Sequence, residues 1–330
     1  MGEDWGVDHF RRSTLNYFSA GGLDRATLLR PRNEWLEERL EDPATRIIPV
    51  WQSRNLLEGD SVPRPVLLSP PQLRAAGLDC AAAILLGTYA EVVYFAIDLV
   101  GDETSLLPLI PSGASFRELR DVGPLLDANA GSMLAYARAI TYWHDRHRHC
   151  GDCGALTRVA DGGHWRVCSN AACAQKHFPR TDPAVIVLLL HRAAGAEERC
   201  LLGRQRGWPE NLFSAVAGFV EPGESLEDAV VREVAEETGI TVAAVHYHSS
   251  QPWPFPSSLM LGFTATAAGD VILRHDEELA EARWFTRTQI VQELRARRLR
   301  VARRVSIAYR LLEDWFDAGD LGPLAGYLVE

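Results

Sequence analysis

Short apolar runs separated by proline and glycine turns make up the first part of the chain. The runs cover residues 46–50, 65–68 and 92–100, and a stretch with helical spacing follows over residues 124–143. Short apolar runs between turn residues predict buried strands, and apolar positions at helical spacing predict a packed helix. We therefore predict an N-terminal α+β domain over residues 1–140.

A second mixed pattern begins after Pro179 and Pro183. Strand-like segments cover residues 184–191, 199–203, 242–247 and 259–267, a charged helix lies among them, and a helical region starts at Thr286. Strands alternating with helices predict an α/β fold. We expect this second domain over residues 179–318, followed by a tail over 319–330. No short internal repeat is visible, but two halves of similar size leave an ancient duplication open.

Four of the six cysteines lie in a short segment between these domains, residues 141–178. They form two pairs, Cys150 with Cys153 and Cys168 with Cys173. Paired cysteines across a short loop predict a zinc ribbon with one Zn²⁺ per chain. Four thiolate ligands leave no open coordination position, so the site is expected to be structural. Unliganded reduced cysteines are the alternative.

Composition limits the partners of the protein. The net charge of −10 argues against a general affinity for nucleic acid or anionic membranes, although local basic patches remain possible. Residues 1–12 carry charge and no apolar run, and the longest apolar stretch, residues 184–190, is too short to span a bilayer. We expect a cytoplasmic protein with no membrane partner. Cys80 and Cys200 stand alone in apolar surroundings and are expected to be inert.

The charged helix places three carboxylates on one face. Ser225 and Asp228 predict its capped start, and Gly239 predicts its left-handed end. Within it Glu233, Glu236 and Glu237 stand at i, i+3 and i+4. Such a cluster of like charges persists most readily around a divalent cation, and oxygen ligands favour Mg²⁺ or Mn²⁺. A solvated acidic face is the alternative.

Residues 218–240 as a whole follow the pattern G-x5-E-x7-R-E-V-x-E-E-x-G-I. This pattern resembles the Nudix box without a break. The resemblance implies a Nudix-fold α/β/α sandwich with a mixed sheet and a diphosphate hydrolase. It implies catalytic roles for Arg232, Glu233, Glu236 and Glu237, metal contact by these glutamates and the Ala217 carbonyl, and structural roles for Gly218, Glu224 and Gly239.

A proline-rich segment follows this helix at residues 250–258. Prolines at alternate positions stiffen the loop, Trp253 and Phe255 can flank a base, and Gln251 and Ser258 can hydrogen-bond polar edges. A packing loop is the alternative. The segment resembles the S-Q-P-W-P-F-P-x-S signature of NADH pyrophosphatases. The substrate contacts expected from it are Gln251, Pro252, Trp253, Pro254, Phe255, Pro256, Ser257 and Ser258.

The same resemblance extends from Cys150 to Arg304. It implies a further metal ligand at Glu278, substrate contacts at Phe178 and Ala302, cleavage of NADH or NAD⁺ and of NAD-capped RNA, and a homodimer. A hydrolase for ADP-ribose or another nucleotide sugar is an alternative, and so is a non-catalytic nucleotide sensor. An arginine run over residues 295–304 can attract phosphates, although a solvated, ion-paired helix is the simpler interpretation.

Overall fold

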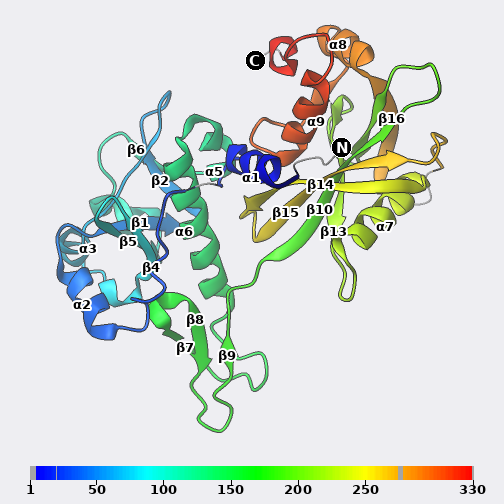
Figure 1. Cartoon of the computed structure of the whole chain (residues 1–330). Helices are drawn as coiled ribbons and strands as arrows, with labels where there is room; N and C mark the ends of the chain where they lie inside the picture. The colour runs from blue at the N-terminus through cyan, green and yellow to red at the C-terminus, as the bar shows by residue number, and fades with distance from the viewer. Residues whose placement is uncertain (1–4, 20, 274–277, 329–330) are drawn as a thin grey trace. The chain divides into compact units, whose positions relative to one another are not determined.

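The computed structural model of the chain describes residues 5–19, 21–273 and 278–328, which fall into two compact units (Figure 1). Unit 1 comprises Met1–Tyr17, Asp182–Pro252 and Ser258–Glu330, and unit 2 comprises Phe18–Thr181 with Trp253–Ser257. Helix α1 (Trp5–Leu15) thus groups with unit 1, whereas the sequence pattern assigns residues 1–140 to a single domain. The predicted boundaries remain a prediction, because compactness alone does not define a folding domain.

The large sheet of unit 1 is mixed, with the strand order β14-β15-β10-β11-β16. Its central strand β10 runs parallel to β15 and pairs antiparallel with β13 along its first half and β11 along its second half. The short strands β12 (Leu212–Phe213) and β17 (Arg300–Val301) form a separate pair. The bounds of the large sheet are β10 (Asp182–His191), β11 (Arg199–Gln205), β13 (Val216–Phe219), β14 (Val242–Trp253), β15 (Ser258–Ala267) and β16 (Leu279–Thr286).

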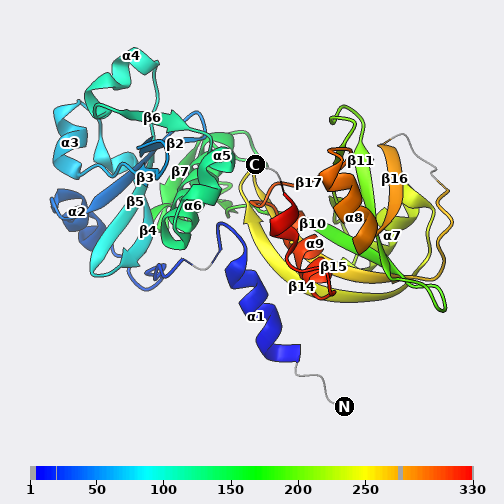
Figure 2. The same cartoon turned by 90° about the horizontal axis from the view of Figure 1, so that it is seen from above.

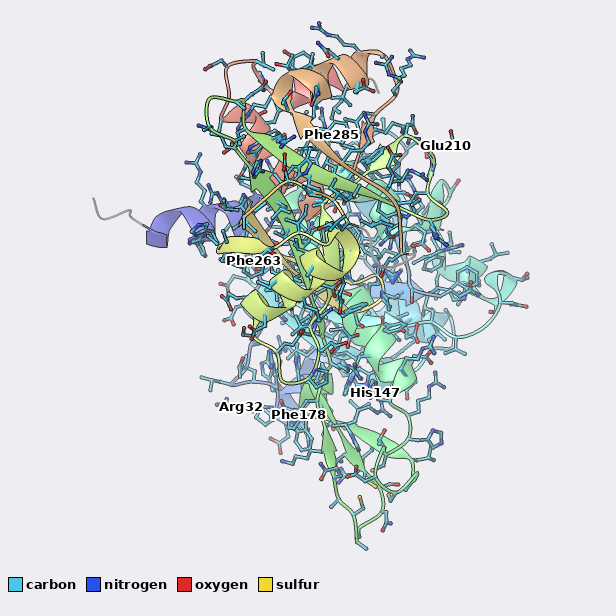
Figure 3. The ribbon with its side chains drawn as sticks, turned by 90° about the vertical axis from the view of Figure 1, so that its right-hand side faces the viewer. Arg32, His147, Phe178, Glu210, Phe263 and Phe285 are labelled. Carbon is cyan, nitrogen blue, oxygen red and sulfur yellow. The ribbon has the colours of Figure 1, made fainter. Side chains whose placement is uncertain are left out.

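Strand β10 contributes to two hydrophobic cores because successive side chains point to opposite faces of a sheet. Val185 and Val187 pack with Val230 and Val234 of α7 (Leu226–Thr238). Ile186 and Leu188 pack into the core covered by α8 (Arg287–Arg295) and α9 (Ile307–Asp317), after which the chain ends in the turn η5 (Leu324–Tyr327) (Figure 2). Phe263 and Phe285, labelled in Figure 3, belong to these two cores. The predicted α/β/α sandwich with a mixed sheet is confirmed.

Unit 2 is built on a second mixed sheet, ordered β3-β2-β1-β5-β4, with β6 also paired to β2. Strands β1 and β5 are parallel neighbours, and the longest helix of the unit, α6 (Ala128–Arg146), packs on them. The remaining bounds are α2 (Asn33–Glu41), β1 (Arg46–Trp51), β2 (Arg54–Glu58), β3 (Arg64–Pro65), α3 (Pro70–Ala75), η1 (Cys80–Ala82), β4 (Ile84–Tyr89), β5 (Val92–Asp98), α4 (Glu103–Leu106), η2 (Leu107–Leu109), β6 (Ala114–Arg117), α5 (Leu119–Val122) and η3 (Gly123–Leu125).

Five of the six strands follow the same order in both sheets, whereas the third strand pairs differently: β13 with the first strand β10, and β3 with the second strand β2. The strands of each sheet can be numbered one to six in chain order. In both sheets the neighbours then run fourth, fifth, first, second and sixth, which is β14-β15-β10-β11-β16 in unit 1 and β4-β5-β1-β2-β6 in unit 2. Helix α9 packs on the parallel pair of unit 1 as α6 does in unit 2. They differ between the third and fourth strands, where unit 1 carries α7 but unit 2 has only short helical turns, including the six-residue α3 without an acidic side chain. Unit 2 therefore shares the order of five strands with unit 1 but has no counterpart of its glutamate helix among the described residues.

The cysteine-rich segment forms a small three-stranded sheet in the order β7-β8-β9. Thr157 pairs with Cys168 in this sheet, so the second cysteine pair starts where β8 ends. The bounds are β7 (Thr157–Ala160), η4 (Asp161–Gly163), β8 (Trp165–Cys168) and β9 (Lys176–His177). The ribbon groups with unit 2.

Most of the predicted strands and helices are present within a few residues of their expected ends. The helix in the charged segment is capped by Ser225 and Asp228 and ends at Gly239, whose φ of 71° is left-handed, as predicted. In the described part of the chain, no helix is both long and apolar enough to cross a membrane.

Candidate active site

Helix α7 carries the predicted carboxylates and is capped at both ends. The Ser225 side chain accepts a hydrogen bond from the Asp228 backbone N–H, and the Asp228 side chain accepts one from the Ser225 backbone N–H. Ala229, Val230 and Val234 are fully buried against the sheet. Because buried positions recur along one side of the helix, the carboxylates of Glu233 and Glu237 are fixed relative to strand β13. Both of these glutamates are buried, at 8% and 2% exposure.

Glu233 lies directly against Gly218 on β13. A Cβ atom built on Gly218 would overlap the carboxyl carbon and both carboxylate oxygens of Glu233. Gly218 pairs with Val185 of the central strand, and its neighbour Ala217 pairs with Ile186. The absence of a side chain at Gly218 is therefore what lets the carboxylate approach the strand that also bears the Ala217 carbonyl.

Arg232 links three glutamates. Its Nε and Nη2 donate to the two carboxylate oxygens of Glu224, at 2.6 and 2.9 Å, in the paired geometry that arginine favours. Its Nη1 donates to Glu233 at 2.9 Å and to Glu236 at 3.0 Å. Glu224 also accepts from the Glu221 backbone N–H at 2.9 Å. Arg232 therefore orients Glu233, and Glu224 ties Arg232 to the loop before the helix.

The electrostatics of the site are those of a crowded acidic cluster. The hydrogen bonds from Arg232, followed by that from Glu221, lower the pKa of Glu224 to about 2. Burial is the largest cause that raises the pKa of Glu233, and the charges of Glu236 and Glu278 raise it further, while Arg232 acts against them. Negative charges thus gather around a buried carboxylate that one arginine only partly neutralises. Carboxylates and a backbone carbonyl are the ligands that Mg²⁺ and Mn²⁺ favour, so the donor set fits such a cation.

The oxygen atoms of this cluster are more widely spread than the sulfur atoms of the ribbon. Among the described residues, only the four cysteines bring three or more candidate ligand atoms within 4.8 Å of one another. Glu236 is also the most exposed of the glutamates that Arg232 contacts, with 55% of its side chain accessible. Of the three carboxylates that Arg232 contacts, Glu236 is therefore the one least enclosed by the protein.

The four ribbon cysteines converge as a tetrahedral site requires. The Sγ atoms of Cys150 and Cys173 are 3.8 Å apart, and those of Cys153 and Cys168 are 3.4 Å apart. A tetrahedral zinc with Zn–S bonds of about 2.3 Å separates its sulfurs by about 3.8 Å, whereas a disulfide joins them at about 2.05 Å. The backbone N–H of Ala155, followed by Cys168, lowers the pKa of Cys153 to about 7. The four sulfurs therefore fit a zinc ion.

The proline-rich loop is divided between two environments. Gln251 is 1% exposed, its Nε2 donates to the Tyr17 and Val305 carbonyls, and its Oε1 accepts from the Ile307 N–H. The expectation that Gln251 hydrogen-bonds a substrate edge does not fit this placement, because backbone groups of the protein take up its amide. Its observed role is to tie β14 to the start of α9.

Trp253 and Phe255 lie in a cluster of rings and arginines in unit 2. Their ring centroids are 4.9 Å apart in an edge-to-face arrangement, and Phe18 contacts both. Arg120 and Arg138 each lie over the Phe255 ring. Sequence patterns did not identify Phe18, Arg120 or Arg138, which stand more than a hundred residues before the loop. The sequence offered one indication of Arg138: it is an arginine at a position where the helical pattern of α6 predicts a buried apolar residue.

The other predicted contact residues differ in exposure. Phe178 is 65% exposed, with Trp165 as its ring neighbour at 6.5 Å (Figure 3). Pro252 and Pro256 are exposed, Pro254 is buried, and Ser257 and Ser258 are half-buried. Ala302 packs at the edge of the core beneath α9, and Glu278 is exposed just before β16. Phe178 is therefore the accessible aromatic group of this set.

Comparisons with known proteins agree with the fold. The family model for the NUDIX domain matches residues 180–305, and that for the NADH pyrophosphatase-like rudimentary NUDIX domain matches residues 44–143. The NAD-capped RNA hydrolase NudC of Mycobacterium bovis is 36% identical over 329 residues, covering 94% of this chain and 97% of that protein. The NAD-capped RNA hydrolase NUDT12 of Macaca fascicularis is 42% identical over 200 residues, covering 58% of this chain. The match spans only 42% of the length of that relative.

Proposed function

Because this chain belongs to the Nudix hydrolase family, we propose that it is a metal-dependent NAD(H) diphosphatase. It cleaves NADH and NAD⁺ into the nicotinamide mononucleotide and AMP, and it removes NAD caps from the 5′ ends of RNA. The observation that carries the proposal is the buried Glu233, seated on Gly218 and oriented by Arg232 within an acidic cluster. The match to a NAD-capped RNA hydrolase along nearly the full length of both chains supports the choice of substrate.

The reaction is a hydrolysis of the diphosphate. The oxygen of a water molecule bonds to one phosphorus, the bond from that phosphorus to the bridging oxygen breaks, and each product leaves as a phosphate monoester. A bound divalent cation supplies neutralisation of the diphosphate charge and a lower pKa for the attacking water. Glu233, Glu236, Glu237, Glu278 and the Ala217 carbonyl are the proposed ligands.

The residues around this set have separate tasks. Arg232 holds Glu233 in place and balances part of the acidic charge. Glu224 fixes Arg232, and Gly218 leaves room for the Glu233 carboxylate. Phe178, Trp253, Phe255 and Ala302 are the proposed contacts for the nucleotide parts of the substrate, with Pro252, Pro254, Pro256, Ser257 and Ser258 shaping the loop that bears the two rings.

The zinc ribbon is proposed to be structural. Four cysteine sulfurs would fill the coordination sphere of one Zn²⁺ per chain, so no position is left for a reacting water. We further propose that the enzyme is a homodimer in the cytoplasm. The domain arrangement proposed is residues 1–140, 141–178 and 179–318 with a tail over 319–330.

A direct test compares substrates under one condition. The full-length protein is incubated with NADH, NAD⁺, ADP-ribose and NAD-capped RNA, with either Mg²⁺ or Mn²⁺, and the products are identified. We expect nicotinamide mononucleotide and AMP from the first two and a 5′-monophosphorylated RNA from the last. A preference for ADP-ribose would favour a nucleotide-sugar hydrolase. Nucleotide binding without turnover in either metal would favour a sensor.

A further inference from the structure

Phe255 lies among rings and arginines of unit 2. Phe255 comes from the loop between β14 and β15, and this loop groups with unit 2. The guanidinium carbons of Arg120 and Arg138 each lie 4.8 Å from its ring centroid, and Phe18 meets it edge-on at 5.7 Å. Arg120 also lies 5.4 Å from the Trp253 ring. Two cations and a third ring therefore hold the two aromatic residues of the loop.

Arg138 is the unusual member of this group. It is 8% exposed, on the buried side of α6. Within the described residues, its Nε and Nη1 are buried without a hydrogen-bond partner, and its one carboxylate neighbour, Glu118, stands 3.8 Å from Nη2. That distance exceeds a normal hydrogen bond. A buried guanidinium left without acceptors is costly, so its retention calls for another source of stabilisation.

The Phe255 ring supplies that stabilisation. A guanidinium over an aromatic face is attracted by the negative charge of the ring, and the attraction strengthens when water is excluded. Burial is the main cause that lowers the pKa of Arg138, and the nearby Arg120 lowers it further, while Glu118 acts in the opposite direction. The two arginines therefore repel each other, and the Phe255 ring is a partner that both contact.

From this arrangement we propose that Arg138 and Arg120 are positioning residues for the NAD(H) diphosphatase reaction, which hold Phe255 and Trp253 in the conformation that receives the substrate. The proposal rests on the proposed function. The rudimentary Nudix-like domain carries no counterpart of the glutamate helix among its described residues. In this proposal its function is to support the loop that contacts the substrate. Because the two arginines act through the loop rings in this proposal, their loss should weaken substrate binding rather than slow the chemical step.

The test is a double-mutant cycle in the full-length protein with NADH and Mg²⁺. We expect Arg138→Met to raise KM roughly tenfold with kcat changed less than about twofold, since the ring remains but loses its desolvated cation. Arg138→Lys should recover part of the loss because it keeps the charge. Combining Arg138→Met with Phe255→Leu should give a KM no higher than Phe255→Leu alone, because the arginine acts through the ring.

Matched variants keep the test decisive. Arg146→Met removes another arginine of α6, which lies over Tyr142 and not over the loop, and should leave KM unchanged. If Arg138→Met fails to fold by melting temperature or zinc content, the same cycle is run with Arg120→Met, a change at an exposed position. The proposal would be overturned if Arg120→Met had the KM of the wild type. It would also be overturned if the KM increases caused by the arginine and Phe255 substitutions multiplied in the double variant. Absence of NADH turnover in the wild-type protein would instead overturn the proposed function.

Discussion

The Glu233 carboxylate lies so close to the Cα of Gly218 that even a methyl group on Gly218 would displace it. A helix and a strand of one sandwich thus meet at a point where only glycine is compatible with the glutamate. Since the Ala217 carbonyl precedes this glycine, the close approach brings two of the proposed metal ligands to one place.

Gly218→Ala should reduce kcat/KM by on the order of a hundredfold, because the displaced Glu233 can no longer occupy its place in the acidic cluster. The fold should persist, since Glu233 can rotate toward solvent. Steady-state kinetics on NADH measure the effect. Gly269→Ala is the matched control, as a Cβ there meets nothing within 4 Å. Equal activity of the two variants would show that the contact has no functional role.

Glu237→Gln should reduce turnover by on the order of a hundredfold or more while the melting temperature stays close to wild type. The change removes one negative charge from the cluster and preserves the shape of the side chain. The matched control is Glu227→Gln, an exposed acidic residue of the same helix. Near-normal turnover of Glu237→Gln over a range of Mg²⁺ concentrations would contradict the metal assignment.

Cys153→Ser should release zinc and lower the free energy of unfolding by more than about 2 kcal/mol, because a structural metal contributes directly to folding. Metal analysis and thermal melting of the purified protein measure both effects. A strong chelator should produce the same loss of stability in the wild-type protein. Cys80→Ser should leave the zinc content unchanged, and wild-type protein that contains no zinc would refute the ribbon assignment.

Trp253→Ala should lower kcat/KM for NADH by roughly tenfold to hundredfold, since one stack between a base and an aromatic ring contributes about 1–3 kcal/mol. The Trp253 ring is half-buried and meets Phe255 on one edge, so part of its surface remains open. Zinc content and melting temperature serve as controls for folding. Unchanged kinetics in a folded variant would show that the loop serves packing alone.

Asp98→Asn should stabilise the protein at neutral pH and not at acidic pH. Burial, and then the charge of Asp145, raises the pKa of Asp98 from 3.8 to about 6. The unfolded chain therefore loses this proton first, so the stability contributed by the protonated group is complete below about pH 4 and is lost as the pH rises through 6.

The expected gain from Asp98→Asn above pH 6 is about 1–2 kcal/mol after allowance for solvent screening. Denaturant unfolding at pH 4.0 and 7.5, both chosen conditions, measures the difference. Asp60→Asn, a change at an exposed acidic residue, is the control and should have no such pH-dependent effect. An equal gain at both pH values would show that the charge of Asp98 is not its cause.

Local sequence signals predicted the helix and the ribbon well because the residues that decide them are near neighbours. The Ser225–Asp228 capping box and the left-handed Gly239 lie at the ends of the helix they define. The cysteine pairs, separated by short loops, similarly converge on one point. Six consecutive residues of β10 are buried, as expected of a short apolar run whose side chains enter cores on both faces of a sheet, and the resemblance to the Nudix box implied the α/β/α sandwich.

Other features depend on contacts between distant parts of the chain. The grouping of α1 with residues beyond 182, the burial of Gln251 against the Tyr17 and Val305 carbonyls, and the shared order of five strands in the two sheets are of this kind. No local pattern encodes them, because each depends on which segments pack together rather than on what each segment prefers by itself.

By itself the sequence determined which residues can do chemistry: the glutamates of one helix face, the four cysteines and the aromatic loop. Only the tertiary structure decided how they are held. It seated Glu233 on Gly218, and it placed Phe255 under Arg120 and Arg138, residues more than a hundred positions away. The physical reason is that residue type and local spacing set chemical capacity, whereas burial and long-range packing set the orientation in which that capacity is used.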